Sequence, residues 1–260
     1  MARLSILGLV IAALVAGCST KKRQRTKEPI DELLSLADEQ WRDRGQVGLD
    51  QLDAALIDAD SRRPGDREVL WRLARVEVAR GLAATEERSR VVHFGQAREF
   101  GLRCLDRHGG FRQQRRLGEW TTGLELLPAA FAPCAGWAAV AWARWVAMVG
   151  PEAVALDRRG AVALGEWARG AGRPDVAGLG AWALATLGSA SPNWVERGQV
   201  LGHYASARRA GVGGLWLEAD QLVWVARPSG DQVMIKRLEA RLRDTRANVP
   251  EDAAARRVID

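Results

Sequence analysis

Cys18 is the residue with the clearest chemical role, because it stands directly after an apolar run near the N-terminus. A thiolate is a nucleophile and can accept a covalently attached lipid. The chain begins Met1-Ala2-Arg3, with one positive side chain, and in residues 4–16 Ser5 is the only polar side chain. This order is typical of a secretory signal peptide. A permanent transmembrane helix needs about 20 apolar residues, so the run is too short to be one.

The run ends in Leu14-Val15-Ala16-Gly17-Cys18, which resembles the lipobox of bacterial lipoproteins. The resemblance implies that residues 1–17 are cleaved and that Cys18 is lipidated. Several acyl chains anchor firmly, since each buried CH₂ contributes about 0.8 kcal/mol. Ser19 rather than Asp follows, which by resemblance to Gram-negative sorting favours the outer membrane, facing the periplasm. The alternative is an ordinary signal peptide with a chance cysteine, or a buried helix.

Two further cysteines, Cys104 and Cys134, remain once Cys18 is modified. An oxidising periplasm permits a disulfide between them. Both fall in or at the edge of expected helices, where two free buried thiols are at least as reasonable. The sequence alone does not place their Cα atoms within the roughly 7 Å that a bridge requires.

Motifs for catalysis are weak in this chain. It lacks His-Glu-x-x-His, Gly-x-Ser-x-Gly and the Walker phosphate loop. Gly178-x-Gly180-x-x-Ala183 resembles a dinucleotide fingerprint, but it follows no expected strand. Glycines that mark the boundary of a helix are the simpler interpretation. The histidines have no paired metal-ligand spacing, and surface or capping roles are their default: His93, His108 and His203. We therefore expect a non-enzymatic protein without metal or cofactor.

Tryptophans are the best candidates for a binding site, since the chain has 11 of them against one tyrosine. Trp137, Trp142 and Trp145 spread over an arc of about 140° on one expected helix. One edge of this arc can pack on a neighbouring helix while the other lines a groove for a ligand or partner. Arg144 projects on the Trp137 side and can meet a ligand carboxylate, or equally pair with a neighbouring acid at the surface. The alternative is that all three rings are core, which is usual for large apolar residues.

Most of the formal net charge of +6 arises in residues 18–29, a basic tether after the lipidation site. Residues 30–260 carry 32 basic and 31 acidic side chains. A nucleic-acid-binding protein concentrates positive charge on its folded domain, so we expect no nucleic-acid partner. The tether is best interpreted as a solvated spacer; contact with anionic lipid headgroups is the alternative.

The body of the chain predicts an all-α fold. From Ile30 onward apolar residues recur at three- and four-residue steps, and sustained period-two alternation is missing. We expect a helical domain over 30–247, a long connection over 111–132 and a flexible tail over 248–260. The most apolar helix is expected over 134–149, between Pro133 and Gly150-Pro151.

Helix pairs recur at about 34 to 40 residues, which favours an α-solenoid of degenerate tetratricopeptide-like hairpins. The first unit carries the pattern in Trp41, Gly45, Leu52, Leu56, Ala59 and Pro64. A helical bundle without repeats is the alternative.

With these features, residues 30–245 resemble the T component of tripartite ATP-independent periplasmic (TRAP) transporters. The resemblance lies in Trp41–Pro64 with Val69–Gly81, in the alanine- and tryptophan-rich stretch 134–145, and in 178–188 continued by 215–245. It implies a helical solenoid around a pore or cleft, a periplasmic solute-binding protein as partner, and a hydrophobic or carboxylated ligand. Arg63-Pro64 stands where the family's repeats end in Asp-Pro, so the number of repeats does not follow from the resemblance.

The leading hypothesis is a lipid-anchored accessory or scaffold protein of a TRAP-type uptake system. The alternative is a scaffold lipoprotein for outer-membrane or envelope assembly, which needs the same fold and anchor. A third hypothesis, an envelope enzyme with a helical fold, predicts a pocket with clustered ionisable groups.

Overall fold

The structure is a computed structural model that describes residues 29–150, 155–191 and 194–259. All regular elements in these ranges are helices, and no strand occurs among them, which confirms the predicted all-α fold. The α-helices are α1 Ile30–Arg42, α2 Arg44–Val47, α3 Leu49–Arg62, α4 Arg67–Ala83, α5 Glu87–Leu105, α6 Gly109–Arg116, α7 Trp120–Glu125, α8 Ala132–Val149, α9 Ala155–Arg169, α10 Pro174–Ser189, α11 Trp194–Arg209, α12 Trp216–Gln221, α13 Arg227–Ser229, α14 Gln232–Asp244 and α15 Pro250–Arg256. A 3₁₀ turn, Ala129–Phe131, precedes α8, and a π-helical segment, Leu222–Ala226, joins α12 to α13.

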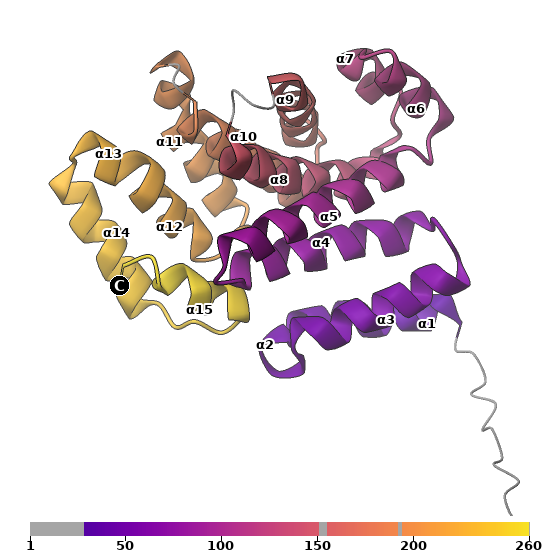
Figure 1. Cartoon of the computed structure of the whole chain (residues 1–260), viewed down its shortest axis with the longest axis horizontal. Coiled ribbons are helices and arrows are strands. Elements are labelled where there is room, and N and C mark those ends of the chain that lie inside the picture. The colour runs from indigo at the N-terminus through magenta and orange to yellow at the C-terminus, as the bar shows by residue number, and fades with distance from the viewer. Residues whose placement is uncertain (1–28, 151–154, 192–193, 260) are drawn as a thin grey trace, which may run out of the picture.

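Successive helices pack as layers. From one side of the molecule to the other, α1 and α3 lie against α4, α4 against α5, α5 against α8, and α8 against α10 (Figure 1). The apolar stripes of α1, α3 and α4 form one core cluster, in which the buried members are Leu34, Ala37, Leu52, Leu56, Ala59, Val69, Leu73 and Val76. The three- and four-residue steps therefore place these side chains on one face of each helix.

Small residues set the distance between the central helices. A Cβ atom added to Gly101 of α5 would lie 2.6 Å from the Cβ of Ala138 in α8. At Gly81 of α4, an added Cβ would lie 2.8 Å from the Phe94 ring of α5. Neither position has room for a side chain without movement, so these two glycines permit the close helix contacts of the core.

The region 111–132 is not the long connection that its sequence suggests. It contains α7 and most of α6, and Phe111 and Leu124 are buried in the main core cluster. His108 begins α6 by accepting a hydrogen bond at Nδ1 from the Phe111 amide, at 3.2 Å. Both helices are short, which is why an apolar period is hard to recognise in the sequence there.

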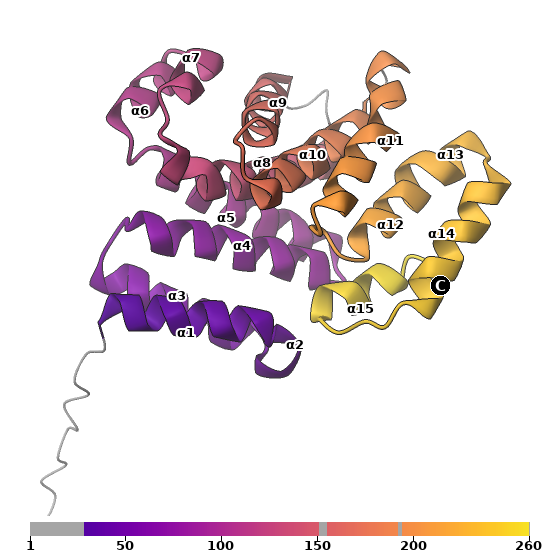
Figure 2. The same ribbon diagram turned by 180° about the vertical axis from the view of Figure 1, so that it is seen from behind.

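The expectation of a flexible tail over 248–260 is also wrong for its described residues. Pro250 begins α15, whose Ala254 and Ala255 are buried and which packs against α4. The C-terminal helices curve back, so that α15 lies near α2 and the end of α4 (Figure 2). The tail lacks a long apolar stripe of its own, and its order comes from contacts with distant helices.

The signal peptide over 1–17, Cys18 and the tether up to residue 28 lie outside the described residues. Among the helices that the structure describes, none is both long enough and apolar enough to span a membrane.

Candidate functional site

An aromatic pocket lies where the chain's N-terminal and C-terminal helices meet. It has a volume of about 290 Å³ and draws its walls from α1, α2, α4, α8, α10 and α15 and from the loop 211–214. We call it the Trp41 pocket. Its lining residues are Trp41, Arg44, Arg75, Val78, Ala79, Leu82, Trp137, Trp182, Gly211, Val212, Gly213, Gly214, Val249, Glu251 and Asp252. Most of these side chains are apolar or aromatic, as is typical of small-molecule sites.

The aromatic wall is held by contacts between rings and guanidinium groups. Trp41 meets Trp137 edge to face, with ring centroids 6.3 Å apart. The Arg44 and Arg75 guanidinium carbons lie 4.0 Å and 4.3 Å from the centroid of the Trp41 ring. Cation–π contacts of this length are attractive and orient both partners. Trp41 is therefore fixed by two cations as well as by its neighbouring ring.

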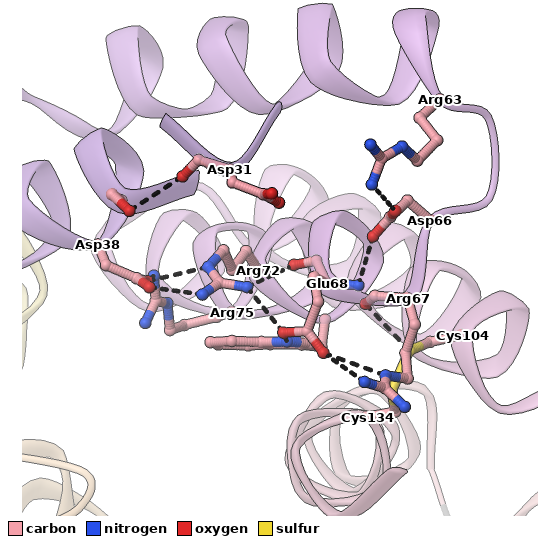
Figure 3. A network of polar contacts seen from close by, with 12 residues as sticks. Asp31, Asp38, Arg63, Asp66, Arg67, Glu68, Arg72, Arg75, Cys104 and Cys134 are labelled. Atoms are coloured by element: carbon pink, nitrogen blue, oxygen red, sulfur yellow. Dashed lines mark hydrogen bonds and ion pairs between the residues drawn. A yellow bond between two sulfur atoms is a disulfide. The ribbon is translucent and has the colours of Figure 1, made fainter. Parts of the chain in front are cut away.

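Arg75 is the most buried cation of the pocket, with an exposed fraction of 8%. Its Nη2 donates to Asp38 Oδ1 at 3.0 Å, and Arg72 donates to the same carboxylate (Figure 3). Burial lowers the pKa of Arg75 to about 10, and the neighbouring charge of Asp38 opposes this shift. Arg75 therefore remains a cation at neutral pH.

Glu251 of α15 closes the pocket by pairing with Arg44 of α2. Arg44 Nε donates to Glu251 Oε1 at 2.7 Å, and its Nη2 lies 2.6 Å from the same oxygen. The third nitrogen of Arg44 donates to the Trp41 carbonyl oxygen at 2.9 Å. Asp252 accepts a hydrogen bond from the Leu215 amide at 2.9 Å, which fixes the end of the loop 211–214. The C-terminal helix is therefore part of the pocket wall.

Of the four groove residues predicted on the central helix, Trp137 lines the Trp41 pocket. Trp142 is buried on the other side of α8, where its ring centroid lies 5.1 Å from that of Trp120. Trp145 faces α5, with the Arg98 guanidinium carbon 4.4 Å from its ring centroid. Arg98 also lies 5.5 Å from the Trp142 ring centroid, so Trp142 and Trp145 share a neighbour, whereas Trp137 faces the pocket. The three rings therefore do not form one shared surface.

Arg144 lies in the interior of the protein, with an exposed fraction of 4%. Its Nη1 donates to Asp220 Oδ1 at 2.8 Å, and its Nη2 pairs with the other oxygen of that carboxylate. Trp182 Nε1 also donates to Asp220, at 3.1 Å. Of the two roles considered for Arg144, pairing with an acid is the one present, and the pair is buried instead of lying at the surface.

Cys104 and Cys134 are joined by a disulfide, with the two sulfur atoms 2.04 Å apart and the Cα atoms 5.8 Å apart (Figure 3). The bridge connects the C-terminal end of α5 to the N-terminal end of α8. It lies next to the N-terminal end of α4, because Cys104 Sγ is 3.5 Å from the Arg67 carbonyl oxygen. The disulfide links two core helices, and neither cysteine lines the Trp41 pocket.

Sequence reasoning missed Arg44, Arg75 and Glu251 as site residues. Arg75 follows Leu73 and Ala74 within an apolar stripe, and a cation at such a position is the signal that was available. Glu251 carried no signal, because it falls in the expected tail and is 207 residues from its partner Arg44. Only the packing of α15 brings the two together.

The described residues contain no group of three or more His, Cys, Asp or Glu side chains placed to hold a metal ion. Within the described lining of the Trp41 pocket, serine, threonine, cysteine, histidine and lysine are missing. The arrangement can bind a ligand through ring stacking, apolar contact and charge. No protein-family model and no curated protein matches this chain.

Proposed function

We propose that this protein is a lipid-anchored periplasmic component of a TRAP-type solute uptake system and that it binds a solute in the Trp41 pocket. The observation that carries the proposal is the pocket itself, which joins three tryptophans and two arginines in a helical array. The lipobox at Cys18 and the resemblance of residues 30–245 to the T component support the place of action. The expected partner is a periplasmic solute-binding protein.

Binding without chemical conversion fits the ionisable groups of the pocket. Arg44 is engaged with Glu251 and with a carbonyl oxygen, and Asp252 holds a backbone amide. A general base must reach a substrate proton, and a nucleophile needs a base beside it. The described lining has no serine, threonine, cysteine, lysine or histidine, so a nucleophile beside a base is missing from it, which favours capture and release of a solute over catalysis.

The partner part of the proposal is testable by photo-crosslinking in intact cells. A photoreactive amino acid is placed at Leu36 or Ile57, two exposed apolar positions on α1 and α3, and at exposed Leu117 on the opposite end of the layers for comparison. We expect a solute-binding protein in the crosslinked product of at least one position. Crosslinks only to outer-membrane assembly factors would instead support the scaffold alternative, and would refute the uptake role.

The anchor is tested separately with Cys18→Ser. We expect the wild-type chain in the membrane fraction and the variant in the soluble periplasmic fraction. Metabolic labelling with a fatty-acid analogue should mark only the wild-type chain. Lipid on the Cys18→Ser variant would contradict the assignment of Cys18 as the lipidation site.

A further inference from the structure

We infer that the Trp41 pocket selects a small monocarboxylate with an aromatic or other apolar body, and that Arg75 binds its carboxylate. The inference rests on the proposed solute binding, but it does not depend on the TRAP assignment. It concerns which chemical groups the pocket accepts and which it excludes.

The polar network of α4 that includes Arg75 has one more positive than negative side chain. Three guanidinium groups, from Arg67, Arg72 and Arg75, share the carboxylates of Asp38 and Glu68 (Figure 3). Among the described residues, no further acid pairs with these arginines. An anion next to Arg75 would therefore compensate the remaining charge in a place where water is largely excluded.

Arg75 also has donors to spare. Its only hydrogen bond among the described residues runs from Nη2 to Asp38. Its Nε is buried without a partner. A guanidinium binds a carboxylate best through two parallel N–H groups. Arg75 keeps such a pair on Nη1 and Nη2, since only one N–H of Nη2 is used by Asp38. Arg44 does not, because Glu251 and the Trp41 carbonyl occupy it.

The pocket lining also carries two acids, of which Glu251 is neutralised by Arg44 and Asp252 is not. Asp252 lines the pocket and uses one oxygen to accept the Leu215 amide, and among the described residues it has no ion-pair partner. Glu251 lies beside it with its second oxygen buried and unpartnered. A second carboxylate near Asp252 would be repelled, whereas an uncharged ring would contact Val212, Val249 and the tryptophans. The charge of Asp252 therefore predicts discrimination against dicarboxylates.

The body of the ligand is limited by the aromatic walls. A volume of about 290 Å³ lies at the lower end of ligand sites and suits a body of one ring with a short chain. Rings stack or meet edge to face with tryptophan, and such contacts add to simple burial. A small aromatic acid therefore uses both features of the pocket at once.

The inference is tested by calorimetric titration of the purified chain with three matched probes: 3-phenylpropanoate, its neutral amide, and 4-(2-carboxyethyl)benzoate, which has a second carboxylate at the far end. We expect the monocarboxylate to bind at least about tenfold more tightly than either of the others. Equal or tighter binding of the dicarboxylate or of the neutral amide would overturn the proposed selectivity. Absence of binding by all three at about 1 mM would overturn the ligand class.

Two variants assign the roles of the walls. Arg75→Gln should lose about tenfold or more in affinity for 3-phenylpropanoate while the amide binds as before, which also reports that the variant is folded. Arg72→Gln is the matched control, because it removes the other guanidinium on Asp38 without changing the lining. Asp252→Asn keeps the oxygen that accepts the Leu215 amide, removes the charge, and should raise affinity for the dicarboxylate.

The outcomes separate the two proposals. Loss of selectivity with intact crosslinking to a solute-binding protein would refute the ligand class alone. Selective binding without such a crosslink would refute the uptake role alone. An Arg75→Gln variant that binds 3-phenylpropanoate as tightly as the wild-type chain would refute the role of Arg75.

Discussion

At the scale of single residues, the ion pair of Arg144 and Asp220 is the charged contact that depends most on burial. Both residues are almost fully buried, with exposed fractions of 4% and 2%. Trp182 adds a third charge-assisted contact through its Nε1. Removing water from two charges is unfavourable, so the pair is stable only while both partners are present.

Replacing Arg144 with methionine should therefore destabilise the fold by about 3–5 kcal/mol, because Asp220 keeps its burial and loses its counter-charge. Urea unfolding followed by circular dichroism measures the change. Arg173→Met is the matched control, since Arg173 forms an exposed pair with Asp175 and should cost less than about 1 kcal/mol. Similar losses for both variants would contradict the importance of burial. Adding Asp220→Leu to Arg144→Met should restore a large part of the stability.

The carboxylates beside the pocket make stability depend on acidity. Burial alone would raise the pKa of Asp38, but its hydrogen bonds and charge contacts with Arg72 and Arg75 outweigh burial and hold that pKa below the ordinary value of 3.8. Burial would likewise raise the pKa of Glu68, but hydrogen bonds from Trp71 and the neighbouring arginines outweigh it and hold that pKa below the ordinary value of 4.5. In both cases the ionised form is favoured by the folded state.

Because these folded-state pKa values are lowered, the contribution is complete above the ordinary values and is lost as the pH falls through the folded ones. Urea midpoints measured from about pH 6 to pH 2 should therefore fall more steeply in the wild-type chain than in Asp38→Asn. Asp43→Asn, at an exposed carboxylate, should keep the wild-type slope. An Asp38→Asn slope as steep as that of the wild-type chain would show that this network does not govern acid stability.

At the scale of helices, the contact between α5 and α8 depends on a residue without a side chain. The Cβ of an alanine at Gly101 would come within 2.6 Å of the Ala138 Cβ, so the two helices would have to separate. The disulfide of Cys104 and Cys134 holds the same pair of helices together near one end. The close contact at Gly101 and the disulfide therefore both hold α5 against α8.

Gly101→Ala should destabilise the protein by about 1–3 kcal/mol through overpacking, although alanine is the better helix former. Gly202→Ala is the control within another helix, since an added Cβ there meets nothing within 4 Å. That change should stabilise by about 0.4–1 kcal/mol, because it restricts only the unfolded chain. Thermal unfolding of both variants gives the comparison, and the same sign of effect at both glycines would contradict the close helix contact.

At the scale of the whole molecule, the N-terminal helix α2 and the C-terminal helix α15 are in contact. Arg44 in α2 and Glu251 in α15 are 207 residues apart and form one ion pair at the edge of the Trp41 pocket. Gly45 lies beside Asn248, where an added Cβ would be 2.2 Å from the Asn248 carbonyl oxygen. The shape of the pocket is therefore coupled to the docking of the C-terminal helix.

Glu251→Ala should loosen both ends while leaving the central layers folded, because Arg44 loses its partner and α15 its contact with α2. Hydrogen exchange by mass spectrometry should accelerate in peptides covering α2 and α15 and stay unchanged in α5 and α8. Glu166→Ala, which breaks an exposed pair with Arg169, is the control and should change neither end. Unchanged exchange at α15 in Glu251→Ala would show that the ion pair does not hold that helix.

The helices and their apolar faces follow from the amino-acid sequence. The stripe that includes Leu52, Leu56 and Leu73 was visible because its three- and four-residue spacing is a local property of a helix. The central helix over 134–149 was likewise recognised from its composition, within two residues of α8. The short helices between 109 and 125 and the helix α15 were missed, since their order depends on contacts with distant segments.

The candidate site was decided by the tertiary structure. Trp137 was predicted as a binding residue and lines the pocket, but its partners Trp41, Arg75 and Glu251 come from three other helices. Spacing along one helix gives the direction of a side chain and does not give the chain segment that faces it. For the same reason the sequence left Cys104 and Cys134 open between free thiols and a bridge, whereas the packing of α5 on α8 brings their Cα atoms to 5.8 Å.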